Sequence, residues 1–350
     1  MALLLGLAGG LGGCGENTCE PEGEFFAQSR QIGVIAVDEA AVYWTAVSQD
    51  GDKQLGEVWR KAKDGGDPQR LYQGTADPIF PFPVVSADAT HAYWLEPCSR
   101  PGDPPCAEVR RVSKAGGTAQ TLVRDRVFSF VLDGDRVYFS TSSQQQRNGN
   151  PSTPEADGAV WSMPKDGSSP PVALVENLDR LRHVAVDATH VYFVAARATA
   201  TGREALISRV PKTGGAVEIA ALTGISPYSF VLTDEWLVFH MDRSLSRVGK
   251  GEQQPAFIKN YTEDPVDGLV VVGDTVYFGD SGHTEGTTLD PDASNYICGA
   301  IRSIPLSGGE VKTFSEEEIR PHSLMTDGTM LYWVSGSSDS PSNTIRRSKL

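Results

Sequence analysis

Polar side chains suited to ligand binding lie just before short apolar segments that recur along the chain. The candidates are Arg182, His183, Tyr228, Asp267 and His322. A guanidinium, two imidazoles, a phenol and a carboxylate can hold a polar ligand through hydrogen bonds and charge. Asp267 and His322 are in addition a candidate acid–base pair. The plainer interpretation is that these groups cap the ends of strands.

An acidic segment supplies a second candidate site. The sequence DSGHTEGTTLDPDASNY (280–296) carries Asp280, Asp290 and Asp292. Carboxylates spaced in this way can bind Ca²⁺, although the segment lacks the full ligand pattern of an EF-hand. A solvated acidic loop accounts for it more simply. We therefore expect no bound cofactor, with Ca²⁺ as the alternative.

Recognised catalytic motifs are absent from the sequence. It contains no GxSxG, no HExxH, no P-loop and no GxGxxG that leads into a helix. Those motifs carry the nucleophile, zinc and phosphate chemistry of large enzyme classes. A binding role is therefore favoured over catalysis, and the sequence alone leaves catalysis open.

The elements that must position these residues form an internal repeat. A short aromatic segment, typified by VDATHVYFVA (186–195), recurs seven times. Neighbouring copies are 39 to 55 residues apart, which suits β-propeller blades with variable loops. The aligned aromatic column reads Tyr43, Tyr93, Tyr138, Tyr192, Val238, Tyr277 and Tyr332.

Each repeat is predicted to hold four short strands. An apolar strand and the aromatic strand are followed by a segment such as ISRVPKTGG (207–215) and a tail such as VEIAALTG (217–224). β-branched and aromatic residues favour strands, whereas Asp and Lys-x-Gly-Gly segments favour tight turns. The lysines of these turns are expected at solvated strand ends rather than in a basic binding ring. They are Lys63, Lys114, Lys165, Lys212 and Lys250.

The repeat count predicts an all-β, seven-bladed β-propeller of four-stranded blades, with six or eight blades as alternatives. The last repeat stops after its third strand, at Leu350, while GEFFAQS (23–29) is an isolated strand-like segment. Pairing the two would complete the last blade and cover an exposed sheet edge. Because each blade needs its neighbours to bury its apolar faces, the aromatic column should pack between blades. We expect a single propeller domain over 24–350.

The first residues are typical of an export signal. ALLLGLAGGLGG (2–13) is apolar and too short to cross a bilayer as a helix. It runs into Leu11-Gly12-Gly13-Cys14, which resembles the bacterial lipobox. We expect a lipoprotein-type signal peptide over 1–14, lipid on Cys14 and a polar tether over 15–23. No Lys or Arg precedes the apolar run, unlike most signals, so an uncleaved apolar tail is the alternative.

Of the five cysteines, four remain if Cys14 carries lipid. An even number of cysteines in an exported chain favours disulfides. Cys98 and Cys106 bracket the segment SRPGDPP and are expected to pair, which leaves Cys19 and Cys298 by elimination. A metal site is disfavoured, because no CxxC motif or neighbouring pair of histidines accompanies them.

The formal net charge of −14 excludes one class of partner. Nucleic-acid binding needs a positive surface, which an acidic chain of this composition does not offer. The acidity is otherwise explained by solubility.

The segments VDATHVYF and ISRVPKTGG resemble the repeats of bacterial YWTD-like or TolB-like β-propeller lipoproteins, over about residues 25–350. YWTD propellers commonly have six blades, whereas seven repeats are present here. The resemblance implies a cell-envelope lipoprotein of unknown function, monomeric and attached to the membrane only by its lipid.

Members of such families bind a protein, peptide or glycan, and propellers bind at the mouth of the central channel. The alternative is a metal-dependent propeller enzyme of lyase or lactonase type, with its site in that channel. Gly15-Glu16 places no Asp after Cys14, which favours the outer membrane, with the protein facing the periplasm or the cell surface.

Overall fold

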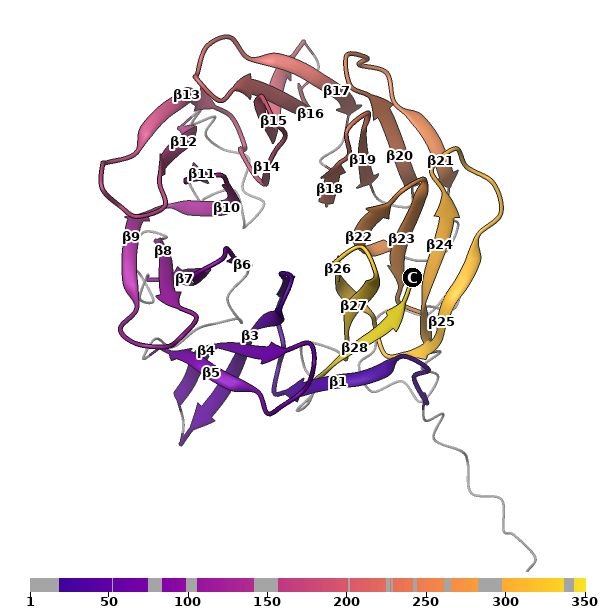
Figure 1. Cartoon of the computed structure of the whole chain (residues 1–350). Helices are drawn as coiled ribbons and strands as arrows, with labels where there is room; N and C mark the ends of the chain where they lie inside the picture. Colours follow the sequence, from indigo (N-terminus) through magenta and orange to yellow (C-terminus); the bar gives the residue numbers. More distant parts are fainter. Residues whose placement is uncertain are drawn as a thin grey trace, which may run out of the picture.

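The computed structural model describes residues 19–51, 53–74, 84–98, 106–141, 157–200, 202–224, 227, 229–241, 244–260, 266–282, 298–336 and 343–350. They form seven four-stranded antiparallel sheets, arranged as blades in a ring (Figure 1). The seven-bladed propeller predicted from the repeat is confirmed, and the alternatives of six or eight blades are wrong.

The blades are numbered in chain order, and within each one the strands run from the centre of the ring to its rim. The innermost strands are β2 (Ile35–Val37), β6 (Val85–Ala87), β10 (Val127–Asp133), β14 (Val184–Val186), β18 (Ser229–Leu232), β22 (Val266–Val272) and β26 (His322–Thr326). The second strands are β3 (Ala41–Asp50), β7 (His91–Pro97), β11 (Arg136–Thr141), β15 (His190–Thr199), β19 (Trp236–Met241), β23 (Thr275–Asp280) and β27 (Met330–Ser335). The third strands are β4 (Lys53–Ala62), β8 (Ala107–Ser113), β12 (Gly158–Pro164), β16 (Gly202–Pro211), β20 (Ser244–Gly249), β24 (Gly299–Pro305) and β28 (Asn343–Lys349). The outermost strands are β5 (Gln69–Gln73), β9 (Gln120–Asp125), β13 (Val172–Leu178), β17 (Glu218–Gly224), β21 (Ala256–Asn260), β25 (Lys312–Glu318) and β1 (Glu24–Ser29).

The N-terminal strand closes the ring. β1 pairs antiparallel with β28, so that Glu24 lies opposite Arg347 and Ser29 lies opposite Asn343. Blade 7 therefore joins the two ends of the described chain, as expected from the isolated segment 23–29. Closure removes the unpaired edge that β28 would otherwise present.

The core is divided among the seams between blades. The buried apolar residues of the described chain form seven clusters, and each cluster draws on two neighbouring blades. Tyr192 of blade 4, for example, packs with Leu237 and Phe239 of blade 5. This confirms that the aromatic column packs between blades, and it explains why a single blade could not fold alone.

A recurring polar clamp crosses most of these seams. In blade 4, Asp187 Oδ1 accepts the backbone N–H groups of Thr189 and His190 at 2.9 Å each and so shapes the turn between β14 and β15. Its Oδ2 accepts the Tyr192 hydroxyl at 2.9 Å and the Lys250 ammonium of blade 5 at 2.9 Å. Burial of the carboxylate opposes ionisation, but these donors outweigh it and hold the pKa of Asp187 well below its usual range.

Five seams carry this Asp–Lys pair. The pairs are Asp38–Lys114, Asp88–Lys165, Asp133–Lys212, Asp187–Lys250 and Asp327–Lys63. The lysine side chains are only 15–19% exposed. The expectation that these lysines lie at solvated strand ends is therefore wrong, because each one reaches across the seam to the preceding blade.

The two remaining seams have neither the Asp nor the Lys of the clamp. Thr233 stands at the Asp position of blade 5, and Leu306 stands at the Lys position of blade 6. Val272 and Leu350 occupy the two positions at the seam between blades 6 and 7. Leu306 and Leu350 pack into the apolar clusters of these seams. Losing both partners avoids a partly buried charge without a counterion, which would be costly.

Candidate functional site

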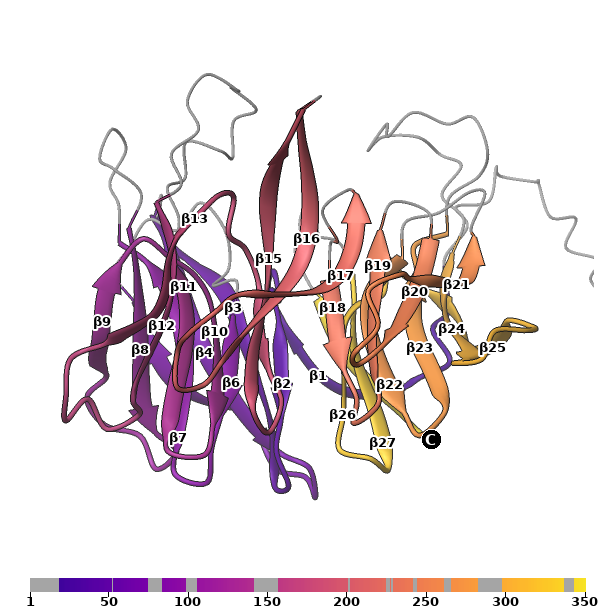
Figure 2. The same cartoon turned by 90° about the horizontal axis from the view of Figure 1, so that it is seen from above.

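The two faces of the ring differ in what they present. The tight turns and the Asp–Lys clamps lie on one face, which we call the turn face. The loops between second and third strands, and the links between blades, lie on the opposite face, which we call the loop face (Figure 2). The β15–β16 hairpin projects from the loop face. Variable loops on a rigid frame are the usual place for binding specificity.

The sequence candidates fall where the innermost strands begin, at the centre of the loop face. We call this region the channel mouth and define it by Phe128, Arg182, His183 and His322. Tyr228 lies outside the described residues. Asp267 is placed in β22 opposite Gly279, but its side chain lies outside the described part.

The histidine of blade 4 contacts an aromatic residue of the neighbouring blade. The imidazole of His183 meets the ring of Phe128, in blade 3, edge to face with centroids 5.4 Å apart. The side chain of His183 has an exposed surface, but the blades around the channel mouth surround it. This partial desolvation, together with the neighbouring Arg182 charge, lowers the pKa of His183 to about 4. His183 is therefore neutral at pH 7 and can donate one hydrogen bond and accept another.

The adjacent arginine offers an unused positive charge. Arg182 is exposed, and its backbone N–H donates to Val194 O at 2.9 Å, which fixes the residue beside β15. Its guanidinium has no carboxylate partner among the described residues. Such a group binds a ligand carboxylate or phosphate through two parallel hydrogen bonds.

The histidine of blade 7 is held in one tautomer. His322 Nδ1 lies 3.0 Å from the backbone carbonyl of Arg320. A carbonyl only accepts, so Nδ1 carries the proton and Nε2 remains available as an acceptor. The chain around His322 is strained, since Arg320 and Ser323 have φ of 42° and 52°. Ser323 Oγ accepts the backbone N–H of Ile35 in blade 1 at 3.0 Å, which anchors this strained turn.

The proposed acid–base pair remains a prediction. Asp267 and His322 start neighbouring innermost strands, and β22 contacts β26. The strands approach closely at Gly268, whose φ is +66° and where an added Cβ would meet Leu324 atoms at 2.8 and 3.0 Å. The backbone therefore brings the two residues to one seam.

The acidic candidates for Ca²⁺ remain a prediction, because only Asp280 of the three lies in the described part of the chain. Asp280 Oδ2 accepts Arg302 Nε at 3.0 Å, and Oδ1 accepts the backbone N–H of Gly282. Asp290 and Asp292 lie outside the described residues. Within the described ranges, no group of three His, Cys, Asp or Glu side chains could hold a metal ion.

Two residues at or beside the mouth were not among the binding candidates. Phe128 stands in the same column as Arg182 and His322, five residues before the turn Asp of its blade, so the repeat gives its place but no binding role. Arg180, exposed and with φ of 51°, comes two residues before Arg182 in the same link. Its conformation carries no sequence signal, because left-handed backbone is rare outside glycine.

Both expected disulfides are present. Cys98 is bonded to Cys106, and Cys19 is bonded to Cys298 across 279 residues of sequence. The first closes a short loop of blade 2, whereas the second ties the N-terminal segment to blade 6. Two disulfides are consistent with an exported protein. The described part of the chain contains no apolar helix of membrane-spanning length.

Comparisons with known proteins identify a fold and no family. No protein-family model matches the chain, and no curated protein sequence matches it. Among solved structures, the chain is similar to the β-propeller domain of the Trilobed protease from Pyrococcus furiosus, at 8% identity and a TM-score of 0.61. That match covers 91% of this chain and 97% of the domain.

A longer peptidase also matches over part of its length. The acylaminoacyl peptidase of Pyrococcus horikoshii is 10% identical with a TM-score of 0.57, over 91% of this chain and 52% of that one. The chain thus spans about half the length of that peptidase. The putative TolB from Agrobacterium tumefaciens matches at 14% identity over 92% of this chain and 91% of its own, with a TM-score of only 0.40. The two matches with TM-scores above 0.5, both at 10% identity or less, show a β-propeller fold and nothing finer.

Proposed function

We propose that this chain is an exported, lipid-anchored β-propeller that binds a protein, peptide or glycan at its channel mouth without catalysing a reaction. The observation that carries the proposal is the mouth itself. Two polar groups have no partner among the residues that the structure describes: the exposed Arg182 guanidinium of blade 4 and Nε2 of the half-buried His322 of blade 7. Both stand on a frame fixed by the seams. Groups held in place before a ligand arrives lose little entropy on binding.

The proposed setting is the cell envelope, with lipid on Cys14 as the only membrane attachment and the outer membrane as its location. The two disulfides support export. The described mouth also gives reason to favour binding over the alternative of a metal-dependent lyase or lactonase. A neutral His183 beside a free guanidinium suits recognition of an anionic or polar group.

The test is co-purification from native membranes with matched variants. The mouth variant is Arg182→Ala with His322→Ala. The control is Arg124→Ala with His190→Ala, which changes the same residue types on the outer strand β9 and at the turn face. We expect the mouth variant alone to lose the co-purified ligand.

Equal retention of the ligand by both variants would contradict binding at the mouth. Stoichiometric metal in the purified protein, removed by Asp267→Ala, would replace the binding proposal with the enzyme. Mass spectrometry of the mature N-terminus tests the lipid on Cys14 separately.

A further inference from the structure

The Cys19–Cys298 disulfide pins the N-terminal segment to the loop face. Cys298 directly precedes Gly299, the first residue of β24, and so lies where the second-to-third loop of blade 6 ends. The bonded Cys19 is therefore held at the loop-face rim of blade 6. Residue 18 is joined to the chain at this point.

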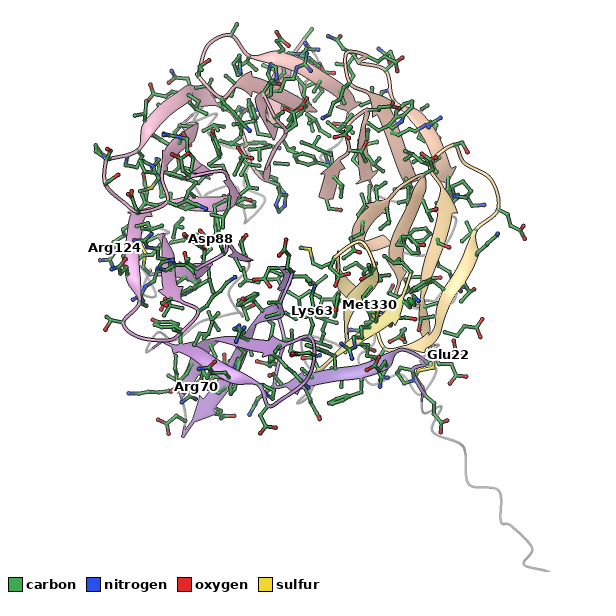
Figure 3. All side chains as sticks on the ribbon, in the orientation of Figure 1. Glu22, Lys63, Arg70, Asp88, Arg124 and Met330 are labelled. Carbon is green, nitrogen blue, oxygen red and sulfur yellow. A yellow bond between two sulfur atoms is a disulfide. The ribbon has the colours of Figure 1, made fainter. Side chains whose placement is uncertain are left out.

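The next residues run from the loop face toward the turn face along the seam between blades 6 and 7. Glu20 N–H donates to Glu317 Oε2 at 3.1 Å, and Glu22 N–H donates to the Glu316 carbonyl at 3.4 Å. Arg346 of blade 7 donates to the carbonyls of Pro21 and Gly23 at 3.1 and 2.6 Å. Figure 3 shows Glu22 on the outer rim of the ring.

The segment then reverses its direction. β1 begins at Glu24, opposite Arg347, close to the end of β28 that reaches the turn face. It returns to the loop face at Ser29, opposite Asn343. Without the disulfide, residues 20–23 are held by hydrogen bonds, and once these open the first fixed residue is Glu24 near the turn face. With the disulfide, the chain is fixed covalently from Cys19 at the loop face.

We propose that this disulfide sets how the ring sits on a membrane: the turn face is kept away from the bilayer, and the loop face with the channel mouth is held beside it. The inference rests on the proposed lipid at Cys14. Five peptide units separate Cys14 from Cys19, so the tether reaches at most about 18 Å. The seven residues of β24 span about 23 Å between the two faces. A ring resting on its turn face would therefore lift Cys19 beyond the reach of its tether.

Removing the disulfide removes this restriction. If residues 19–23 detach, ten peptide units separate Cys14 from Glu24, and the tether reaches about 35 Å. That length exceeds the height of a blade, and Glu24 itself lies near the turn face. Both orientations are then allowed, so the covalent bond decides between them.

Three arginines of the loop face can meet anionic lipid headgroups, whereas Glu20 and Glu317 at the rim of blade 6 are acidic. Most described arginines pair with a carboxylate, carbonyl, hydroxyl or ring, as in Arg203–Asp179 and Arg302–Asp280. In the described part of the chain, the arginines with no such contact are Arg30, Arg180 and Arg182. All three lie on links between blades at the loop face. Each basic residue near an anionic bilayer contributes about 1 kcal/mol of attraction.

The experiment measures orientation directly. The mature chain, residues 14–350, is coupled through its N-terminus to a synthetic diacyl lipid and inserted into phosphatidylethanolamine–phosphatidylglycerol vesicles with a headgroup acceptor dye. A donor dye is attached through an azide-bearing amino acid at Thr199, in the exposed loop-face hairpin, or at Ala115, in an exposed turn of the turn face. Because the faces are about 23 Å or more apart, we expect energy transfer from position 199 to exceed that from position 115 at least about twofold.

The same pair of labels in Cys19→Ser with Cys298→Ser should show a smaller difference, with folding checked by its melting curve. Equal transfer from both positions in the disulfide-bonded protein, or greater transfer from position 115, would overturn the proposal. Because the lipid is coupled chemically, this result does not depend on natural lipidation. A native N-terminus without lipid at Cys14 would instead refute the proposed function.

Discussion

Removing the long-range disulfide should cost far more stability than removing the short one. The bond between Cys19 and Cys298 spans 279 residues, whereas the bond between Cys98 and Cys106 spans 8. A cross-link stabilises mainly by restricting the unfolded chain, with an effect that grows with the logarithm of the loop length. This gives about 5–6 kcal/mol for the long loop and about 2.5 kcal/mol for the short one.

The change should be visible as a shift in melting temperature. An unfolding entropy of about 2.1 cal/mol/K per residue over roughly 330 folded residues gives about 0.7 kcal/mol per degree. Cys19→Ser with Cys298→Ser should then lower Tm by about 8 °C, and Cys98→Ser with Cys106→Ser by about 3–4 °C. Replacing both cysteines of a pair leaves no free thiol to mispair.

Differential scanning calorimetry under non-reducing conditions provides the measurement, and wild-type protein with dithiothreitol should reproduce the combined loss. Equal shifts for the two double variants would refute the loop-length reasoning. A larger shift for the short pair would show that local packing, rather than closure of the ring, dominates the effect of the cystines.

Three further predictions concern the seams, and denaturant unfolding checks all of them. Asp187→Asn should cost about 1–3 kcal/mol at pH 7 because it weakens a hydrogen-bonded ion pair. Since the folded pKa of Asp187 is lowered, its contribution to stability is present above the unfolded pKa near 4 and is lost as the pH falls below that value. The variant should therefore lose less stability on acidification than wild type, and parallel pH profiles would argue against the clamp. Gly268→Ala should cost about 2–4 kcal/mol, because φ is +66° there and the added Cβ would clash with Leu324. The control Gly273→Ala should cost about 1 kcal/mol, because φ is +54° but the space around the added Cβ is open. Similar losses for both variants would mean that the close approach at Gly268 is absent. Tyr192→Ala should cost about 3–5 kcal/mol, since the residue is only 1% exposed. Tyr192→Phe, which loses only the hydrogen bond to Asp187, should cost about 1 kcal/mol. Unchanged stability of Tyr192→Ala would contradict the packing role of the aromatic column.

The architecture was predictable because a repeated pattern averages out local ambiguity. A single VYF segment could be a strand of many folds, but seven copies at blade spacing leave few arrangements. The stop at Leu350 and the isolated segment 23–29 also predicted how the ring closes. What they could not give was the path of residues 19–23, which depends on contacts with β25 and β28 far along the chain.

The clamp was hidden because its partners are distant in sequence. Lys250 pairs with Asp187 across 63 residues, and the sequence of one repeat gives no sign of this contact. The signal was nevertheless present as paired changes: Thr233 appears with Leu306, and Val272 appears with Leu350. Finding it requires comparing each repeat with the next one, since an acid and its base belong to different blades.

The candidate site was predictable in place and not in chemistry. The repeat located Arg182 and His322 at the start of innermost strands, and the structure places them there. Their ionisation and tautomers depend on surroundings that no spacing shows, such as the enclosure of His183 and the carbonyl beside His322. The variable loops of the loop face carry no repeat signal, so they gave no prediction of a ligand.

Hydrogen–deuterium exchange, with and without the co-purified ligand, tests the central claim of binding at the channel mouth most directly. We expect the ligand to slow exchange in the segments that begin β10, β14 and β26, around Phe128, His183 and Ser323. The clamp turns on the opposite face, such as the one at Asp187–His190, should exchange at unchanged rates. Protection confined to those turns or to the outer strands, with none at the mouth segments, would contradict the account.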